Sequence, residues 1–152
     1  MQIAAMAPVA LNQESVPQTV KDKEFEASID KAKQNQIQKS VENALKKAGI
    51  NPAHVDSDDH IASNTEKGWI TAEQGELAKQ IKKQIAEEKA ASLPKEMIEN
   101  IAKGMLQKFF KESCLLEQAY IDDSKISVAQ YLTSVDKELT VTDFKRFTLR
   151  AE

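Results

Sequence analysis

The sequence has 152 residues, of which 41% are hydrophobic and 30% are charged, with a formal net charge of -3. A chain of this length and composition is expected to build one ordinary domain with its own core, which excludes general disorder. Acidic and basic residues are interspersed and nearly balance, so neither nucleic acid nor a membrane surface is expected as a partner, and a protein or a small ligand remains.

The first predicted element is a long helix over residues 17–48. It follows an apolar segment, Met1–Val9, which lacks the basic leader of a signal sequence and is interpreted as the tail of a helix. Pro17 suits a first helical turn, and Gly49 suits the residue after a helix end. Between them apolar residues recur at mostly three- and four-residue spacing. They are Phe25, Ile29, Ala32, Ile37, Val41, Leu45 and Ala48. Such a helix is about 48 Å long at 1.5 Å per residue, so we expect it to project from a small domain.

A connection and a second long helix follow. Over residues 49–68 the periodicity fails, which predicts a connection with short helical turns. Thr71 and Gln74 then form a capping box that opens the second helix. Its narrow apolar stripe is typical of a coiled-coil seam. The stripe consists of Leu77, Ile81 and Ile85. The two helices are therefore predicted to pair as an antiparallel helical hairpin.

The last third of the chain predicts a small α+β base. Ser92-Leu93-Pro94 interrupts the second helix, and a third apolar stripe follows. That stripe consists of Ile98, Ile101, Met105 and Phe109. Residues 114–121 are predicted to be extended, 127–135 to form a short helix, and 140–149 to form a closing β element. The predicted class is thus helix-rich α+β, with a small α+β base and a long projecting, coiled-coil-like hairpin.

The segment His54–His60 is the strongest metal candidate, because it gathers carboxylates and imidazoles. A calcium loop beginning at Asp56 would need Gly at its sixth position and an acid at its twelfth, where the chain has Ile61 and Lys67. A zinc site would need cysteines or a helical two-histidine register. We interpret the segment as a solvated acidic loop and expect no metal.

Two single residues invite a functional reading. Cys114, the only cysteine, is either a nucleophile or a packed side chain, and packing is favoured because no base lies near it in the sequence. A lone cysteine forms no internal disulfide, and with no signal peptide or apolar spanning run the cytoplasm is expected.

Trp69 is either a partner anchor or a residue that packs the connection, and packing is again favoured. No phosphate loop or nucleophile elbow is present, so neither an enzyme nor a cofactor site is predicted.

Three segments in order resemble one family. Residues 97–112 followed by Cys114–Gln118 resemble a helix and the segment after it in elongation factor Ts, and Met1–Pro8 and Asp143–Leu149 agree as well. The resemblance implies that residues 1–152 are its C-terminal, dimerisation region. In that reading residues 17–93 form an enlarged helical hairpin insertion, and residues 1–16 and 94–152 form the α+β base.

The resemblance also implies a function. Elongation factor Ts binds elongation factor Tu, in its GDP-bound and nucleotide-free forms, and promotes GDP release by binding rather than by chemistry. The matching family segment touches the GTPase, which makes Tyr120, Ile121 and Asp122 candidate contacts. Ile121 has an alternative role as a core residue of the small sheet. Residues 1–152 alone are expected to be a poor exchange factor, because the first core subdomain has no counterpart in them.

Two further expectations concern association. The hairpin stripe is expected to be a self-association surface that forms a homodimer, because a small base cannot bury the apolar faces of long helices. Its residues are again Leu77, Ile81 and Ile85. The alternative function is a helical scaffold or dimerisation module without exchange activity.

Overall fold

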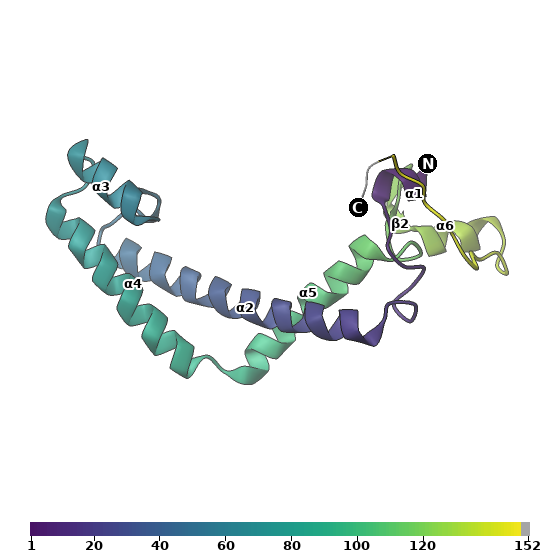
Figure 1. Ribbon diagram of the computed structural model, residues 1–152, viewed down its shortest axis with the longest axis horizontal. Helices are drawn as coiled ribbons and strands as arrows, with labels where there is room; N and C mark the ends of the chain where they lie inside the picture. The colour runs from purple at the N-terminus through teal and green to yellow at the C-terminus, as the bar shows by residue number, and fades with distance from the viewer. Residues whose placement is uncertain (150–152) are drawn as a thin grey trace. The chain divides into compact units, whose positions relative to one another are not determined.

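A computed structural model describes residues 1–149 of the chain. In chain order (Figure 1), its elements are α1 (Gln2–Met6), α2 (Gln18–Lys47), the short 3-10 helix η1 (Pro52–His54), α3 (Asp58–Glu66), α4 (Ala72–Ser92), α5 (Lys95–Ser113), β1 (Ala119–Tyr120), β2 (Asp123–Ser127) and α6 (Val128–Val135). The predicted helix-rich α+β class is confirmed. The chain divides into two compact units, one formed by Met1–Ser28 with the residues from Ile101 onward, the other by Ile29–Asn100.

The unit Ile29–Asn100 is built on the helical hairpin. In Figure 1, α4 returns alongside the second half of α2. Val41 and Leu45 of α2 pack with Ala78 and Ile81 of α4 in one apolar cluster. The cluster also contains Ile50, Val55, Ile61 and Ile70 from the connection. The predicted pairing of the two long helices is confirmed, and the connection supplies half of its core.

Local signals set the ends of these helices. Gly49, the second residue after α2, adopts φ +74, a left-handed conformation that glycine takes without a steric cost. Ser57 is the N-cap of α3, where its hydroxyl accepts a hydrogen bond from the His60 amide at 3.2 Å. Thr71 and Gln74 form the predicted capping box at the start of α4. The connection is therefore an ordered structure of short helices, as predicted.

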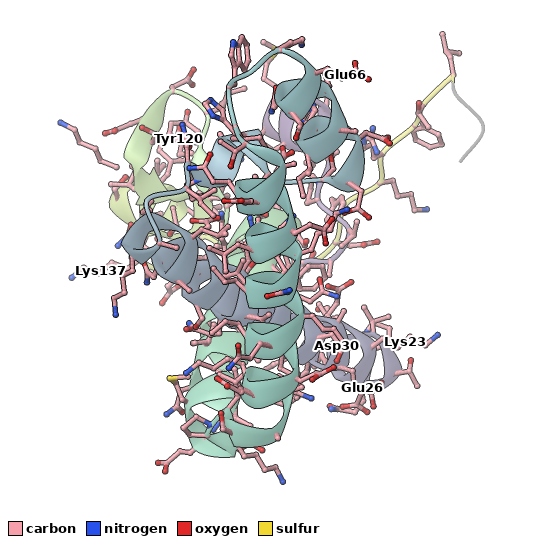
Figure 2. All side chains as sticks on the ribbon, turned by 90° about the vertical axis from the view of Figure 1, so that its left-hand side faces the viewer. Lys23, Glu26, Asp30, Glu66, Tyr120 and Lys137 are labelled. Atoms are coloured by element: carbon pink, nitrogen blue, oxygen red, sulfur yellow. The ribbon has the colours of Figure 1, made fainter. Side chains whose placement is uncertain are left out.

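The outer faces of the helices are polar. Lys23, Glu26 and Asp30 of α2 are exposed and point away from the ribbon (Figure 2). Among the described residues, no helix combines the length and the apolar character needed to cross a membrane.

The other unit joins the two ends of the chain. Val16, Phe110 and Cys114 form its buried apolar cluster. The backbone of residues 9–11 runs beside the end of α5, with hydrogen bonds that include Leu115 N to Ala10 O at 2.9 Å. A two-stranded antiparallel sheet, β1 with β2, follows α5, and Ser127 caps α6 in a second capping box. The predicted short helix over 127–135 is thus confirmed.

Two predictions of extended structure were wrong or only partly right. Within residues 114–121, only Ala119 and Tyr120 lie in a strand, and the amides of Glu117 and Gln118 both donate to Cys114 O in a turn. None of the described residues 140–149 lies in a strand, and Phe147 is 92% exposed. An alternating pattern forms a strand only when a neighbouring strand pairs with it, and β1 and β2 pair only with each other.

Candidate partner-binding site

The segment Gln118–Asp122 is anchored at its start by a buried amide. Gln118 has no solvent exposure, and its Nε2 donates to the backbone oxygens of Met6 at 3.1 Å and Glu112 at 2.8 Å. These oxygens lie in the last turns of α1 and α5, where carbonyl groups lack partners within their own helix. The backbone oxygen of Gln118 accepts from Val128 N at the start of α6. The Gln118 side chain therefore ties the ends of α1 and α5 to the candidate segment, and its backbone oxygen adds the start of α6.

The three candidate contact residues lie together at the turn of the β1–β2 hairpin. Tyr120 ends β1, and Ile121 and Asp122 form the turn before β2. Ile121 is 38% exposed and Asp122 is exposed, so the side chain of Ile121 is not part of the buried core. Their contact with a partner remains a prediction.

Tyr120 is held against a second aromatic ring. Its ring, labelled in Figure 2, stacks on that of Tyr131 in α6, with centroids 4.1 Å apart and planes 8° apart. A hydrogen-bonding interaction with the Asp122 carboxylate, and a second with Tyr131, raises the pKa of the Tyr120 phenol above its usual value. The carboxylate disfavours a second negative charge beside it. The stack and this polar contact fix one edge of the turn.

The predicted self-association residues have different environments. Leu77 is 43% exposed, whereas Ile81 packs against the apolar cluster within the hairpin and Ile85 is half-buried. Ile81 of the stripe therefore packs in the hairpin's own core, whereas the side chain of Leu77 is exposed to solvent. A homodimer through this face remains a prediction.

The His54–His60 segment contains a hydrogen bond between His60 and Asp56 rather than a ligand cluster. His60 Nδ1 hydrogen-bonds to Asp56 Oδ1, and this bond lowers the pKa of the Asp56 carboxyl. His54 lies 5.6 Å from Trp69 between ring centroids. Across residues 1–149, no group of three or more His, Cys, Asp or Glu side chains is arranged to hold a metal ion.

Trp69 packs on the connection in part, because its ring lies 5.6 Å from that of His54 between centroids, but most of the side chain is exposed. It is 61% exposed, and its ring lies under the Lys67 ammonium, 5.2 Å from Nζ to the ring centroid. The adjacent Ile70 is the buried residue, at 6% exposure. Ile70 fills the buried position in the apolar cluster of the hairpin, so the larger side chain of Trp69 stays mostly in solvent.

Cys114 is a packed side chain. It has no solvent exposure and lies in the apolar cluster with Val16 and Phe110. Burial, with a smaller contribution from Glu117, raises the pKa of the thiol to about 11, against an opposing effect of Lys21. The thiolate that a nucleophile requires is therefore scarce at neutral pH.

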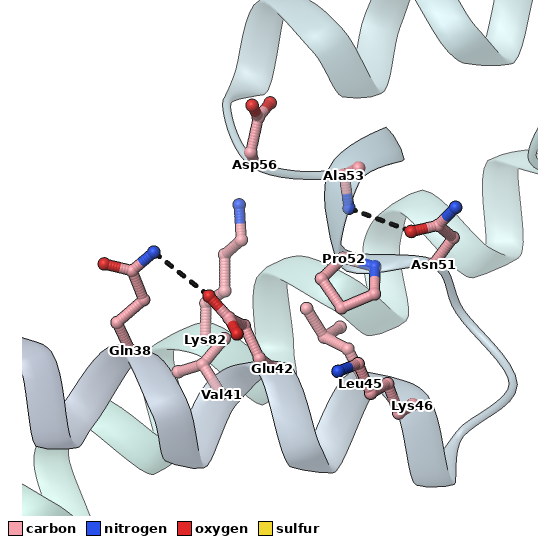
Figure 3. Close-up of a pocket in the computed structure, with 10 residues that line it drawn as sticks. All are labelled: Gln38, Val41, Glu42, Leu45, Lys46, Asn51, Pro52, Ala53, Asp56 and Lys82. Atoms are coloured by element: carbon pink, nitrogen blue, oxygen red, sulfur yellow. Dashed lines mark hydrogen bonds between the residues drawn. The ribbon is translucent and has the colours of Figure 1, made fainter.

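A pocket lies at the tip of the hairpin (Figure 3). The last turns of α2, residues 51–53 of the connection, and Lys82 of α4 line it. Its charged lining contains two carboxylates, on Glu42 and Asp56, and two ammonium groups, on Lys46 and Lys82. This balance of charge indicates no particular class of ligand.

Comparison with known proteins decides the family. The family model described as Elongation factor TS matches residues 1–151. The chain belongs to the elongation factor Ts family. The protein named Elongation factor Ts from Parabacteroides distasonis is 57% identical over 152 residues, which cover 100% of this chain and 46% of that relative. The one from Bacteroides fragilis gives the same values. The one from Flavobacterium psychrophilum is 42% identical over 121 residues, which cover 78% of this chain and 39% of that relative.

This elongation factor Ts chain therefore spans about half the length of the curated relatives it matches. No solved structure matches it significantly. The resemblance drawn from residues 97–118 and the two chain ends is confirmed by the family match.

Sequence reasoning about this family member missed the residues that support the candidate segment. Gln2 and Gln118 lie in segments that carry the family resemblance, but no local pattern marks either of them, or Tyr131, as a support for the candidate segment. Gln2 bonds to the backbone of residues 119 and 121, and Tyr131 stacks on Tyr120. These partners are separated by up to 119 residues in the chain, beyond the range of any local pattern.

Proposed function

We propose that this chain is part of a guanine-nucleotide exchange factor that binds elongation factor Tu in the cytoplasm, and that Tyr120, Ile121 and Asp122 form part of the contact. The observation that carries the proposal is the family match over residues 1–151. The geometry supports it, because Ile121 and Asp122 are exposed on a hairpin turn. The backbone of this segment is held by hydrogen bonds of Gln2 and Gln118. Loops held by a rigid scaffold are common positions for binding residues.

The proposed mechanism is thermodynamic coupling. A factor that binds nucleotide-free elongation factor Tu more tightly than the GDP-bound form lowers the affinity of the GTPase for GDP by the same ratio. No residue of the chain needs an acid, base or nucleophilic role. Because the chain spans about half of its relatives, we expect residues 1–152 alone to bind with little acceleration of GDP release.

The contact is tested by comparing matched apolar truncations. In calorimetric titrations against nucleotide-free elongation factor Tu, Ile121→Ala should weaken binding about tenfold, because burying this side chain contributes on the order of 1 to 3 kcal/mol. Val135→Ala on α6 is the control, since Val135 is also an exposed apolar residue, at 61% exposure. Both variants should melt close to the unaltered chain. Equal affinity of Ile121→Ala and the control would overturn the assignment.

The alternative function, a dimerisation module, is favoured by one observation. Leu77 exposes 43% of its surface on α4, although the rest of the stripe is partly covered within the hairpin. We propose that a second copy of the chain covers it. Light scattering should show a dimer that Leu77→Asp converts to a monomer and that Gln80→Asp, at an exposed position on the same helix, does not. A monomer at high concentration of the unaltered chain would contradict this.

A further inference from the structure

The side chain of Gln2 contacts the candidate segment from the opposite end of the chain. Its Nε2 donates to the backbone oxygen of Ala119 at 2.9 Å, and its Oε1 accepts from the backbone amide of Ile121 at 2.8 Å. The same Nε2 lies 3.3 Å from the Oε1 of the buried Gln118. One carboxamide therefore bridges two backbone groups on either side of Tyr120. We call this pair of hydrogen bonds, to Ala119 O and from Ile121 N, the Gln2 bracket.

The Gln2 bracket supplies the backbone hydrogen bonds that a neighbouring strand would otherwise make. An edge strand presents backbone N–H and C=O groups that need partners, and alternate residues present them on the same side. At this edge of β1, the Gln2 amide supplies one donor and one acceptor at that spacing. The backbone of residues 119–121 is thereby fixed without a third strand.

We propose that Gln2 is a positioning residue for recognition of elongation factor Tu, an inference that rests on the proposed function of Tyr120, Ile121 and Asp122. Fixing the backbone on both sides of Tyr120 presents the turn in one conformation before the partner arrives. Preorganisation of this kind raises affinity because less conformational freedom is lost on binding. Gln2 itself acts through the segment.

The partial exposure of the Gln2 bracket allows a role in positioning the segment to be distinguished from a role in folding. Gln2 and Ala119 are half-buried and Ile121 is exposed, so water reaches this edge of the segment when the two backbone hydrogen bonds are lost. The segment is also held at its start by the two donations of the Gln118 side chain, although Gln2 itself contacts Gln118 Oε1 at 3.3 Å. Removing the bracket should therefore loosen residues 119–121 locally and leave the melting temperature nearly unchanged.

The experiment uses two variants and one control in the full chain. Gln2→Met keeps the length of the side chain and removes all three hydrogen bonds of Gln2. Gln2→Glu keeps an acceptor for the Ile121 amide and loses the donations to Ala119 O and Gln118 Oε1. Gln107→Met, at an exposed position on α5, is the control. Hydrogen exchange of individual amides by NMR gives the local readout. The Val128 amide, which donates to Gln118 O at 2.9 Å, is the internal reference.

We expect exchange at Ile121 to be about tenfold faster in Gln2→Met and faster by a smaller factor in Gln2→Glu, which keeps the acceptor but loses the donor, with Val128 unchanged in both. Affinity for nucleotide-free elongation factor Tu should fall about fivefold in Gln2→Met, the loss expected for hydrogen bonds that fix the bound conformation. Gln107→Met should match the unaltered chain in every measurement.

The outcomes separate this proposal from the function on which it rests. Unchanged exchange at Ile121 in Gln2→Met, or faster exchange with unchanged affinity, would overturn the positioning role alone. Failure of the unaltered chain to bind elongation factor Tu would overturn the proposed function and with it the purpose assigned to the bracket. Faster exchange at Val128 as well would show a general loss of structure and would also count against positioning.

Discussion

Replacing the buried Gln118 by Met tests how the hairpin turn is attached to the rest of its unit. The substitution keeps an unbranched side chain of similar length, so it leaves little cavity and removes mainly the polar contacts. Two partly buried hydrogen bonds donated by the buried Gln118 side chain are lost, at 3.1 Å to Met6 O and at 2.8 Å to Glu112 O. Each carbonyl left without a partner costs about 1 to 3 kcal/mol, so we expect a total loss of roughly 2 to 6 kcal/mol.

That loss is a large fraction of the roughly 5 to 15 kcal/mol by which a domain is usually stable. Urea unfolding followed by helical circular dichroism measures it, with Gln107→Met at an exposed position as the control. The control should change the free energy of unfolding by less than about 0.5 kcal/mol. A loss below about 1 kcal/mol in Gln118→Met would refute the reasoning, because it would mean that the two carbonyls are satisfied without this side chain.

Three further predictions follow from the packing and the pKa shifts. At pH 8 the native Cys114 thiol should react with a disulfide reagent about a hundredfold more slowly than in urea, because its pKa is raised to about 11; equal rates would contradict this. Because the pKa of the Cys114 thiol is higher in the folded chain than in the unfolded chain, it contributes to the free energy of unfolding at pH values below the unfolded thiol's pKa. This contribution is lost as the pH rises through about 11. Asp122→Asn should lower the pKa of Tyr120, seen as earlier tyrosinate absorbance in an alkaline titration, and an unchanged curve would remove the carboxylate as the cause. Gly75→Ala should destabilise the hairpin by about 1 to 3 kcal/mol, because the added Cβ would lie 2.9 Å from Ile61 Cγ2; a higher melting temperature would show that the helix preference of Ala outweighs the clash.

Local signals explain why most of the helical structure was predictable. A capping box needs only residues three positions apart, so Thr71 with Gln74 located the start of α4 directly from the sequence. Gly49 located the end of α2 for the same reason, since its φ of +74 depends on its own backbone. Helix pairing followed from periodicity, because a narrow apolar stripe must be covered.

The parts that depend on distant partners were not predictable. A strand over residues 140–149 required a neighbour that the sheet does not provide. The bracket of Gln2 on Ile121 joins residues 119 positions apart, and the polar character of Gln2 carried no signal of it. The exposure of Trp69 was missed because its neighbour Ile70 occupies the buried position. The predicted contact residues, in contrast, came from family resemblance, and the structure adds how they are held.

The measurement that tests the account most directly is the affinity of the chain for elongation factor Tu in two nucleotide states. Calorimetric titration against the nucleotide-free and the GDP-bound GTPase gives both dissociation constants under the same conditions. Residues 1–152 are predicted to bind the nucleotide-free form and to prefer it over the GDP-bound form by less than about tenfold, or about 1.4 kcal/mol, because little acceleration of GDP release is expected of them alone. No binding to either form, or tighter binding to the GDP-bound form, would contradict the proposed function.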